Sequence, residues 1–292
     1  MNETVQWIDA NGSAYTLSPR QDDLAALFDF KGRYMPPVEF VEDDVPMQPG
    51  SRLREARVRP REVDLAILFK GSSESVLRTN LRTWLHRLDP ARGDGKLRIT
   101  APDGSQRELF CRYATGMQGD ETPSTRGTCW QKALFVLRAV DPFWYAVSPV
   151  VATYTVGAAA PFFPFFPLVL ATSGVFAAPV IANGGDVEAW PVWAIDGPCT
   201  SLTLTNLTTG KALGLTATLL AGESIAIDTR PGRKTVTKTD VGGATSNIFS
   251  SLSATSSLWP LIKGDNSVRI EMTDTDVSSQ ATLAYYARYL GA

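Results

Sequence analysis

The spacing of apolar residues predicts one amphipathic helix in the chain, over residues 73–88. Large apolar side chains recur there every three or four positions and so share one helix face: Leu77, Leu81, Trp84, Leu85 and Leu88. Ser72 or Ser73 is placed to cap the start, and Asp89-Pro90 ends the pattern. His86 falls on the opposite side and is expected to face solvent.

Alternation of apolar and polar residues predicts strands through the rest of the first 150 positions. Asn11-Gly12 joins two such runs within residues 5–18, and Pro102-Asp103-Gly104 joins residues 96–100 to 107–113. Both connections are typical of hairpin turns, because their residues tolerate the backbone angles that a tight turn needs. Residues 62–70 and 134–140 complete a set of at least four strands around the helix.

The second part of the chain has no comparable helical pattern and consists of short alternating runs between Gly- and Asn-containing turns. Seven strands at this spacing are typical of an antiparallel β-sandwich of roughly 100–140 residues. They are expected at 189–195, 201–207, 214–220, 224–229, 234–239, 267–273 and 281–290.

Charge density changes between the two parts. Of the charged residues, 20 basic and 20 acidic fall up to residue 150, and only 8 basic and 10 acidic follow. We therefore expect two domains in a mainly β chain: a charge-rich N-terminal domain over 1–152 with one helix, and a sandwich domain over 153–292. A net charge of −2 does not indicate a nucleic-acid partner.

Residues 156–183 are apolar enough to suggest a membrane span, but four prolines break any helix there: Pro161, Pro164, Pro167 and Pro179. No membrane span is expected. The aromatic residues of this linker need cover: Phe162, Phe163, Phe165 and Phe166. Two interpretations stay open at equal weight, a clasp within the chain and a contact with another subunit.

The residues needed for common enzyme chemistry are missing. A single histidine excludes most histidine triads and histidine-ligated metals. The sequence has no G-x-S-x-G elbow, no phosphate loop and no H-E-x-x-H motif. The cysteines Cys111, Cys129 and Cys199 have apolar neighbours and are expected to be buried thiols. No cofactor, no metal and no catalytic residue are predicted.

Two acidic clusters are the remaining candidates for chemistry. Glu42-Asp43-Asp44 is expected in a loop, and Asp274-Thr275-Asp276 at a hairpin between two late strands. Their carboxylate oxygens suit a hard cation, yet neither has the spacing of a known calcium loop. Solvated turns are the favoured interpretation.

An arginine run over residues 51–62 predicts a surface for binding. If this run is one extended strand, Arg57, Arg59 and Arg61 point to one face. Such a face suits nucleic acid, but it lacks the interleaved aromatic residues of a single-strand platform. Pairing with acidic groups on another subunit is favoured.

The order of landmarks along the chain resembles the distal tail protein family of long, flexible-tailed phages (siphophages). In the first part the landmarks run from Trp84 through Leu88-Asp89-Pro90, Gly95-Lys96-Leu97, Pro102-Asp103-Gly104, Arg107 and Cys111-Arg112-Tyr113 to Gly116. In the second part they are Asp141-Pro142-Phe143-Trp144-Tyr145, Asn183-Gly184-Gly185-Asp186, Trp190-Pro191, Asn206, Thr209-Gly210, Ile227-Asp228-Thr229, Trp259-Pro260-Leu261, Gly264-Asp265-Asn266 and Tyr285-Tyr286-Ala287-Arg288-Tyr289.

This resemblance implies a structural virion protein with a ring-forming N-terminal domain and a galectin-like C-terminal β-sandwich. It implies a homo-oligomeric ring, a hexamer, at the distal end of the tail, made in the host cytoplasm. The implied partners are the tail tube protein, the tape measure protein, and a tail-associated lysin or a fibre or receptor-binding protein. The neutral charge balance of the first domain suits mutual pairing around such a ring.

Two other functions remain as alternatives. A carbohydrate-binding adhesin needs an exposed aromatic ring, for which Trp259 is the candidate, although tryptophan beside proline in a sandwich is more often core. A tail-associated cell-wall hydrolase needs a pair of carboxylates such as Asp43 or Asp276 provide, and it is the less favoured of the two.

Overall fold

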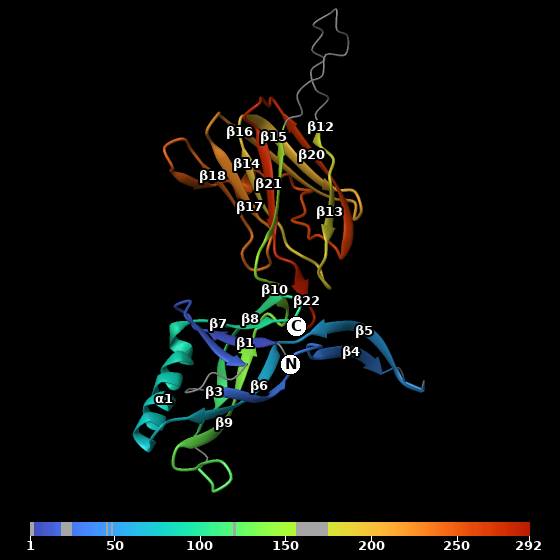
Figure 1. Ribbon diagram of the computed structural model, residues 1–292. Coiled ribbons are helices and arrows are strands. Elements are labelled where there is room, and N and C mark those ends of the chain that lie inside the picture. Colours follow the sequence, from blue (N-terminus) through green and yellow to red (C-terminus); the bar gives the residue numbers. More distant parts are fainter. Residues whose placement is uncertain (1–2, 19–24, 45, 48, 119–120, 156–174) are drawn as a thin grey trace, which may run out of the picture. The chain divides into compact units, whose positions relative to one another are not determined.

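The computed structural model describes residues 3–18, 25–44, 46–47, 49–118, 121–155 and 175–292. The chain forms two compact units. The first comprises residues 1–147 together with 289–292, and the second comprises 148–288. Both are built from antiparallel strands, and the predicted fold class is confirmed: mainly β, with one α-helix in the N-terminal unit and a galectin-like sandwich after it (Figure 1).

The first unit contains a nine-stranded sheet, a separate two-stranded sheet and the helix α1 (Glu74–Arg87). The large sheet has the order β2-β1-β7-β8-β9-β6-β3, with β10 pairing β8 and β22 pairing β10. Its strands are β1 (Thr4–Ile8), β2 (Ala14–Ser18), β3 (Ala25–Lys31), β6 (Arg61–Lys70), β7 (Gly95–Thr100), β8 (Gln106–Gly116), β9 (Trp130–Ala139), β10 (Trp144–Ala146) and β22 (Arg288–Tyr289); β4 (Val38–Asp44) and β5 (Ser51–Val58) form the small sheet, and a 3-10 turn covers Pro90–Arg92.

The helix forms where the apolar spacing predicts it, and its cap explains its start. The Ser73 side chain accepts a hydrogen bond from the Val76 backbone N–H, which satisfies one of the free donors of the first turn. Trp84 is buried and meets the rings of Phe69 and Tyr15 edge to face, at 5.9 and 6.0 Å between centroids. Leu85 is exposed, so the apolar face is narrower than expected.

The hairpin β1–β2 shows how local chemistry fixes a turn. Asp9 Oδ1 accepts hydrogen bonds from the backbone N–H groups of Asn11 and Ser13 at 3.0 and 2.9 Å. Gly12 has a φ of 86°, the left-handed region that glycine adopts without strain. The predicted hairpin within residues 5–18 is confirmed.

The last four residues of the described chain lie in the first unit, where three arginines hold their backbone. Arg61 donates to the Leu290 carbonyl, Arg107 Nη1 donates to the Gly291 carbonyl at 2.5 Å, and Arg33 donates to the Ala292 carbonyl. We call residues 289–292 the C-terminal return. Because it completes the first unit, the predicted assignment of all residues after 152 to the second domain does not hold at this end.

The second unit is a β-sandwich of a six-stranded sheet, β11-β21-β14-β17-β18-β19, and a five-stranded sheet, β12-β20-β15-β16 with β13 on β20. The bounds are β11 (Val150–Thr155), β12 (Val175–Ala177), β13 (Val180–Asn183), β14 (Val192–Asp196), β15 (Cys199–Asn206), β16 (Lys211–Leu219), β17 (Ser224–Asp228), β18 (Thr235–Thr239), β19 (Thr245–Asn247), β20 (Gly264–Thr273) and β21 (Gln280–Tyr285), with a 3-10 turn over Phe249–Ser251.

Each of the seven predicted runs contributes a strand to the sandwich, and four strands were not predicted: β11, β12, β13 and β19. Strand β11 pairs with β21 from Val150↔Tyr285 to Thr155↔Gln280. This pairing places residues 150–155 in the sandwich, so the structure divides the chain before residue 148 and not between 152 and 153.

The turn between β20 and β21 contains a carboxylate, Asp276, whose contribution to stability depends on pH. Asp276 Oδ1 accepts hydrogen bonds from the Ser278 hydroxyl at 2.6 Å and the Ser278 backbone N–H at 2.7 Å. Both bonds lower the pKa of Asp276, and the bond from the Ser278 hydroxyl has the larger effect. A carboxyl whose pKa is lowered by folding stabilises the fold above its unfolded pKa of about 4, and this contribution is lost as the pH falls through the lowered value.

We therefore expect Asp276→Asn to lower the free energy of unfolding at pH 7 and to have a smaller effect at pH 2–3. Urea titrations at both pH values measure the difference, with the exposed Asp265→Asn as control. An equal effect of Asp276→Asn at both pH values would contradict this expectation.

Candidate subunit interface

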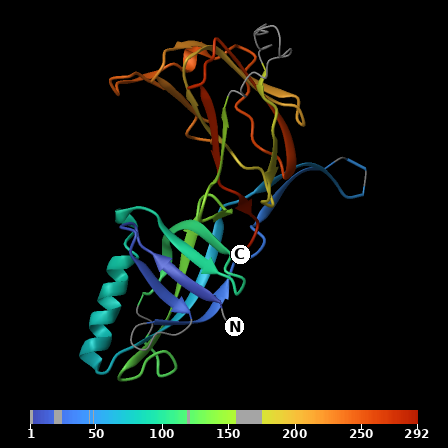
Figure 2. The same ribbon diagram turned by 45° about the horizontal axis from the view of Figure 1, so that its top comes forward.

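The two-stranded sheet β4–β5 is the most exposed element of the first unit. Its strands pair with each other from Val38↔Val58 to Asp44↔Ser51 and belong to no larger sheet. Every residue of β5 is exposed. We call this hairpin the arm; Figure 2 shows it in blue, extending away from the large sheet. An isolated two-stranded hairpin is marginally stable in water, so an element of this kind needs a further surface to pack on.

One side of the arm is apolar. Alternation along β4 and its register with β5 place Val38 opposite Val58 and Phe40 opposite Ala56, and Leu53 lies opposite Glu42 in phase with them. We call these five residues the apolar face: Val38, Phe40, Leu53, Ala56 and Val58. Phe40 is 58% exposed and Leu53 is 60% exposed. The single chain leaves this face in solvent.

Ion pairs bind the charged residues of the arm to one another. Arg59 pairs with Glu39, Arg54 with Asp43, and Arg57 with Glu55 at 2.8 Å. Hydrogen bonding with Arg57 lowers the pKa of Glu55, and the same contact raises the pKa of Arg57. Exposed pairs of this kind contribute little to stability, so they orient the hairpin more than they hold it together.

The structure separates the three arginines that the alternating pattern places on one face. Arg57 lies in β5 and Arg59 just beyond it, and both are exposed. Arg61 begins β6, on the side of Val63 and Leu65, and is only 1% exposed. The expectation of a common face was wrong for Arg61, because β5 ends at Val58 and a new strand begins after Pro60.

Arg61 binds within its own chain. Its Nη1 donates to the carbonyls of Gly32 at 3.2 Å and Arg33 at 2.8 Å, and its Nη2 donates to that of Leu290. Burial lowers the pKa of the guanidinium to about 10. Arg61 therefore holds the first unit together and is removed from the proposed contact surface.

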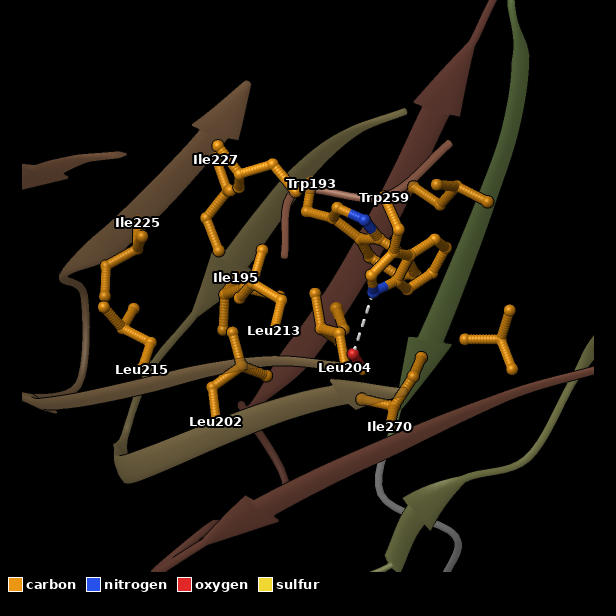
Figure 3. Packing of buried hydrophobic residues seen from close by; sticks show 14 of the residues in the cluster. Trp193, Ile195, Leu202, Leu204, Leu213, Leu215, Ile225, Ile227, Trp259 and Ile270 are labelled. Atoms are coloured by element: carbon orange, nitrogen blue, oxygen red, sulfur yellow. Dashed lines mark hydrogen bonds between the residues drawn. The ribbon is translucent and has the colours of Figure 1, made fainter. Parts of the chain in front are cut away.

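Trp259 lies in the core of the sandwich and cannot stack on a sugar. Its side chain is 2% exposed, its ring meets Trp193 edge to face at 6.1 Å, and its Nε1 donates to the Leu204 carbonyl at 3.1 Å (Figure 3). The indole belongs to the buried apolar cluster of the sandwich. The hypothesis of glycan stacking on Trp259 was wrong.

The other predicted residues divide between described and undescribed parts of the chain. Phe162, Phe163, Phe165 and Phe166 lie outside the described residues. His86 is exposed on α1, as expected. Cys111 and Cys199 are buried; burial raises the pKa of both thiols, that of Cys199 to about 11. Both are therefore protonated and unreactive near neutral pH.

The acidic clusters make local contacts. The expectation of a loop at Glu42-Asp43-Asp44 was wrong, because these residues end β4, where Glu42 bonds to Ser51 and Asp43 to Arg54. The other cluster lies in the β20–β21 turn, as predicted.

Within the described ranges, the structure brings no three histidine, cysteine or acidic side chains together as a metal site would need. Nor does any described helix have the length and apolar character to cross a bilayer.

The apolar face of the arm is the candidate feature that the sequence interpretation missed. Val38 and Phe40 in VEFVEDD (38–44), and Ala56 and Val58 in SRLREARV (51–58), alternate with charges, so the period of two distinguishes them from a polar loop. Leu53 is out of this phase in the sequence, and the register shift between the two strands brings it to the same side.

Residues 184–289 match the family model described as the siphovirus-type tail component, C-terminal domain. Over these residues the chain is similar to the siphovirus-type tail components. This match confirms the resemblance to the distal tail protein family that the ordered landmarks indicate. No curated protein matches the chain.

Solved structures show that the likeness to tail components extends over both units. The Dit protein of phage SPP1, described as a paradigm of the hub adsorption apparatus of phages that infect Gram-positive bacteria, aligns with 99% of each chain at 15% identity and a TM-score of 0.68. Chains of the phage p2 baseplate in its activated conformation, with Sr or with Ca, align with 98% of each chain at 9% identity and TM-scores of 0.54 and 0.55. At these identities the likeness concerns the fold.

Proposed function

We propose that this chain is a distal tail protein, a structural hub at the tip of a long-tailed phage. Copies of it form a closed ring, a hexamer, in the virion. The ring connects the tail tube and the tape measure protein to the baseplate, a tail-associated lysin or a tail fibre that attaches to the host. The tail-component family matched by the second unit and the fold shared with a phage hub protein and phage baseplates support this proposal.

The apolar face of the arm is the observation that carries the proposal. Large apolar side chains exposed together on a projecting hairpin are typical of a protein interface. A closed ring requires head-to-tail contacts, in which one surface of a subunit meets a different surface of the next. A projecting arm suits such a contact, because it reaches beyond the body of its own subunit.

The contacts of the candidate acidic side chains also fit a structural role. Glu42, Asp43 and Asp276 each bond to neighbouring side chains in strands or turns. The adhesin alternative loses the residue predicted to stack on a sugar, because Trp259 is core. No described residue favours the hydrolase alternative.

The ring is tested by the mass of the purified chain in solution. We expect size-exclusion chromatography with light scattering to show a closed oligomer of six times 31.7 kDa. The double variant Phe40→Lys with Leu53→Lys is expected to be monomeric with an unchanged Tm, because charge is placed on the apolar face and not in the core.

The matched control is Val41→Lys, on the opposite side of β4 from Phe40. This variant is expected to assemble as the parent chain does. A parent chain that stays monomeric at high concentration would contradict the proposed ring.

A further inference from the structure

Three apolar side chains are exposed on turns at one end of the sandwich. They are Leu220 in the β16–β17 turn, Val241 in the β18–β19 turn and Val277 in the β20–β21 turn, and they are 62%, 71% and 95% exposed. We call these three residues the apolar tips. Side chains this exposed bury little apolar area in their own unit, so apolar tips that gather at one end indicate a surface on which something else packs.

Contacts between the turns bring the apolar tips together. Gly197, between β14 and β15, donates its N–H to the Glu223 carbonyl at 3.0 Å, and its carbonyl accepts from the Ser278 hydroxyl at 3.4 Å. These two bonds join the β16–β17 turn to the β20–β21 turn. A Cβ atom added to Gly222 would lie 3.5 Å from Val241 Cγ2, so the β18–β19 turn adjoins the β16–β17 turn. The tips therefore share one surface.

An acidic side chain fixes the shape of each of these turns. Glu223, Asp240 and Asp276 each accept a hydrogen bond from a backbone N–H of their own turn, at 2.8, 2.9 and 2.7 Å. Because the turns are ordered before anything binds, docking on them costs less conformational entropy. Asp240 and Asp276 also place negative charge beside Val241 and Val277, which disfavours a surface of anionic lipid as the occupant.

The chain leaves and re-enters the sandwich at this same end. Strand β11 ends at Thr155, opposite Gln280, the first residue of β21. Strand β12 begins at Val175, opposite Glu271, close to the end of β20. The β20–β21 turn with its apolar tip lies between these two neighbours. Residues 156–174, which we call the Phe segment, connect the two points, and they include four phenylalanines and no charged residue.

The Phe segment is long enough to reach all three apolar tips. Phe162 is seven residues after Thr155, a span of up to roughly 23 Å. The farthest tip, Val241, follows β18, which is four strands from β11 in the sheet, or roughly 19 Å. Attachment at both ends holds the phenylalanines near these tips at an effective concentration on the order of millimolar. This tethering favours the tips of the same chain over those of a second copy.

We infer that the apolar tips are the docking surface for the Phe segment of the same chain, whose phenylalanines pack against Leu220, Val241 and Val277. Contact between the two removes apolar surface of both from water, which is the driving force for docking. Of the two interpretations that the sequence leaves open for this linker, the inference selects the contact within the chain. It concerns the second unit alone and does not depend on the proposed ring.

Limited proteolysis of the full chain tests the docking. Chymotrypsin cleaves after phenylalanine unless proline follows, so Phe162 and Phe165 are its phenylalanine sites in the Phe segment. A docked segment is protected from cleavage to the extent that it stays docked. The triple variant Leu220→Asp, Val241→Asp and Val277→Asp should therefore be cut at these sites about tenfold faster than the parent chain.

Leu207→Asp is the matched control, because Leu207 is about half exposed and follows the other end of β15. This variant should be cut at the rate of the parent chain. An unchanged Tm in both variants shows that the second unit remains folded. Equal cleavage rates in the parent chain and the triple variant would overturn the inference.

Disulfide formation identifies the chain that provides the segment. Phe163→Cys combined with Val277→Cys should give an intrachain disulfide on oxidation, seen as a monomer of raised mobility on a non-reducing gel and as a linked peptide by mass spectrometry. Phe163→Cys combined with Leu207→Cys should not. A disulfide-linked dimer without the intrachain product would overturn the inference in favour of a second copy. Flotation of the parent chain, but not the triple variant, with phosphatidylcholine vesicles and no intrachain disulfide would assign the tips to uncharged lipid instead.

Discussion

Replacement of Arg61 by methionine is expected to destabilise the first unit by about 3 kcal/mol, because three backbone carbonyls each lose a hydrogen bond, and that of Arg33 keeps another, from Trp144 Nε1. Methionine fills much of the same space, so the effect reports hydrogen bonding and not a cavity. The carbonyls are those of Gly32, Arg33 and Leu290, which come from two distant parts of the chain. For a unit of this size the change corresponds to a fall in Tm of roughly 10 °C.

Differential scanning calorimetry of the full chain measures this fall, and hydrogen exchange of β6 and β9 assigns it to the first unit. Arg59→Met is the matched control, two positions earlier, where the arginine is exposed and pairs only with Glu39. We expect it to cost less than 1 kcal/mol. A loss of stability as small in Arg61→Met as in the control would show that the buried guanidinium contributes no net stabilisation.

Replacement of Trp259 by alanine is expected to destabilise the sandwich by about 3–5 kcal/mol, the range for removing a large aromatic side chain from a core. The indole is one of the largest fully enclosed side chains of the second unit, packed on Trp193 (Figure 3). Its loss leaves a cavity and also leaves the Leu204 carbonyl without its donor.

Trp259→Phe separates the two contributions, because it keeps an aromatic ring and removes the N–H group. We expect it to cost about 1–2 kcal/mol, through the unpaired carbonyl and a smaller cavity. Urea unfolding followed by hydrogen exchange of β14 and β15 measures both variants. Native-like stability of Trp259→Ala would contradict the buried position of the ring and reopen the question of a sugar site.

The elements best predicted from the sequence are those whose first and last residues give a local signal, such as a capping side chain or a turn-forming pair. Residues 73–88 predict α1 to within one residue at each end, because the Ser73 cap and the residues before Pro90 determine where a helix can begin and stop. The first hairpin is predicted because Asn11-Gly12 suits only a tight turn. The sandwich strands are predicted because a half-buried strand needs strict alternation.

Strand β4 was missed because it is stabilised by its partner strand and not by its own residues. Glu42, Asp43 and Asp44 in succession disfavour a strand by propensity, and they are extended here because β5 supplies cross-strand partners. No local pattern around residue 42 contains this information. The same holds for Arg61, whose buried carbonyl partners include one 229 positions away.

The candidate interface was predicted in part. The sequence indicates an exposed charged surface at Arg57 and Arg59, and the structure places Arg57 on the arm and Arg59 just beyond it, paired with Glu39 of the arm. Whether this surface contacts another subunit is the proposal tested above. The apolar residues between the charges were given no role, because five arginines dominate the composition of residues 51–62.

The C-terminal return makes the second unit an insertion. The chain leaves the first unit after β10 and comes back at β22, and these two strands pair. Adjacent paired strands lie about 5 Å apart, so the whole of residues 148–288 begins and ends at one narrow point of its host. A domain joined in this way can be exchanged for any other domain whose two ends lie close together. Arg61 and Arg107 would continue to bind the C-terminal return. Proteins with the same first unit and an unrelated inserted domain are the expected evolutionary product of this topology.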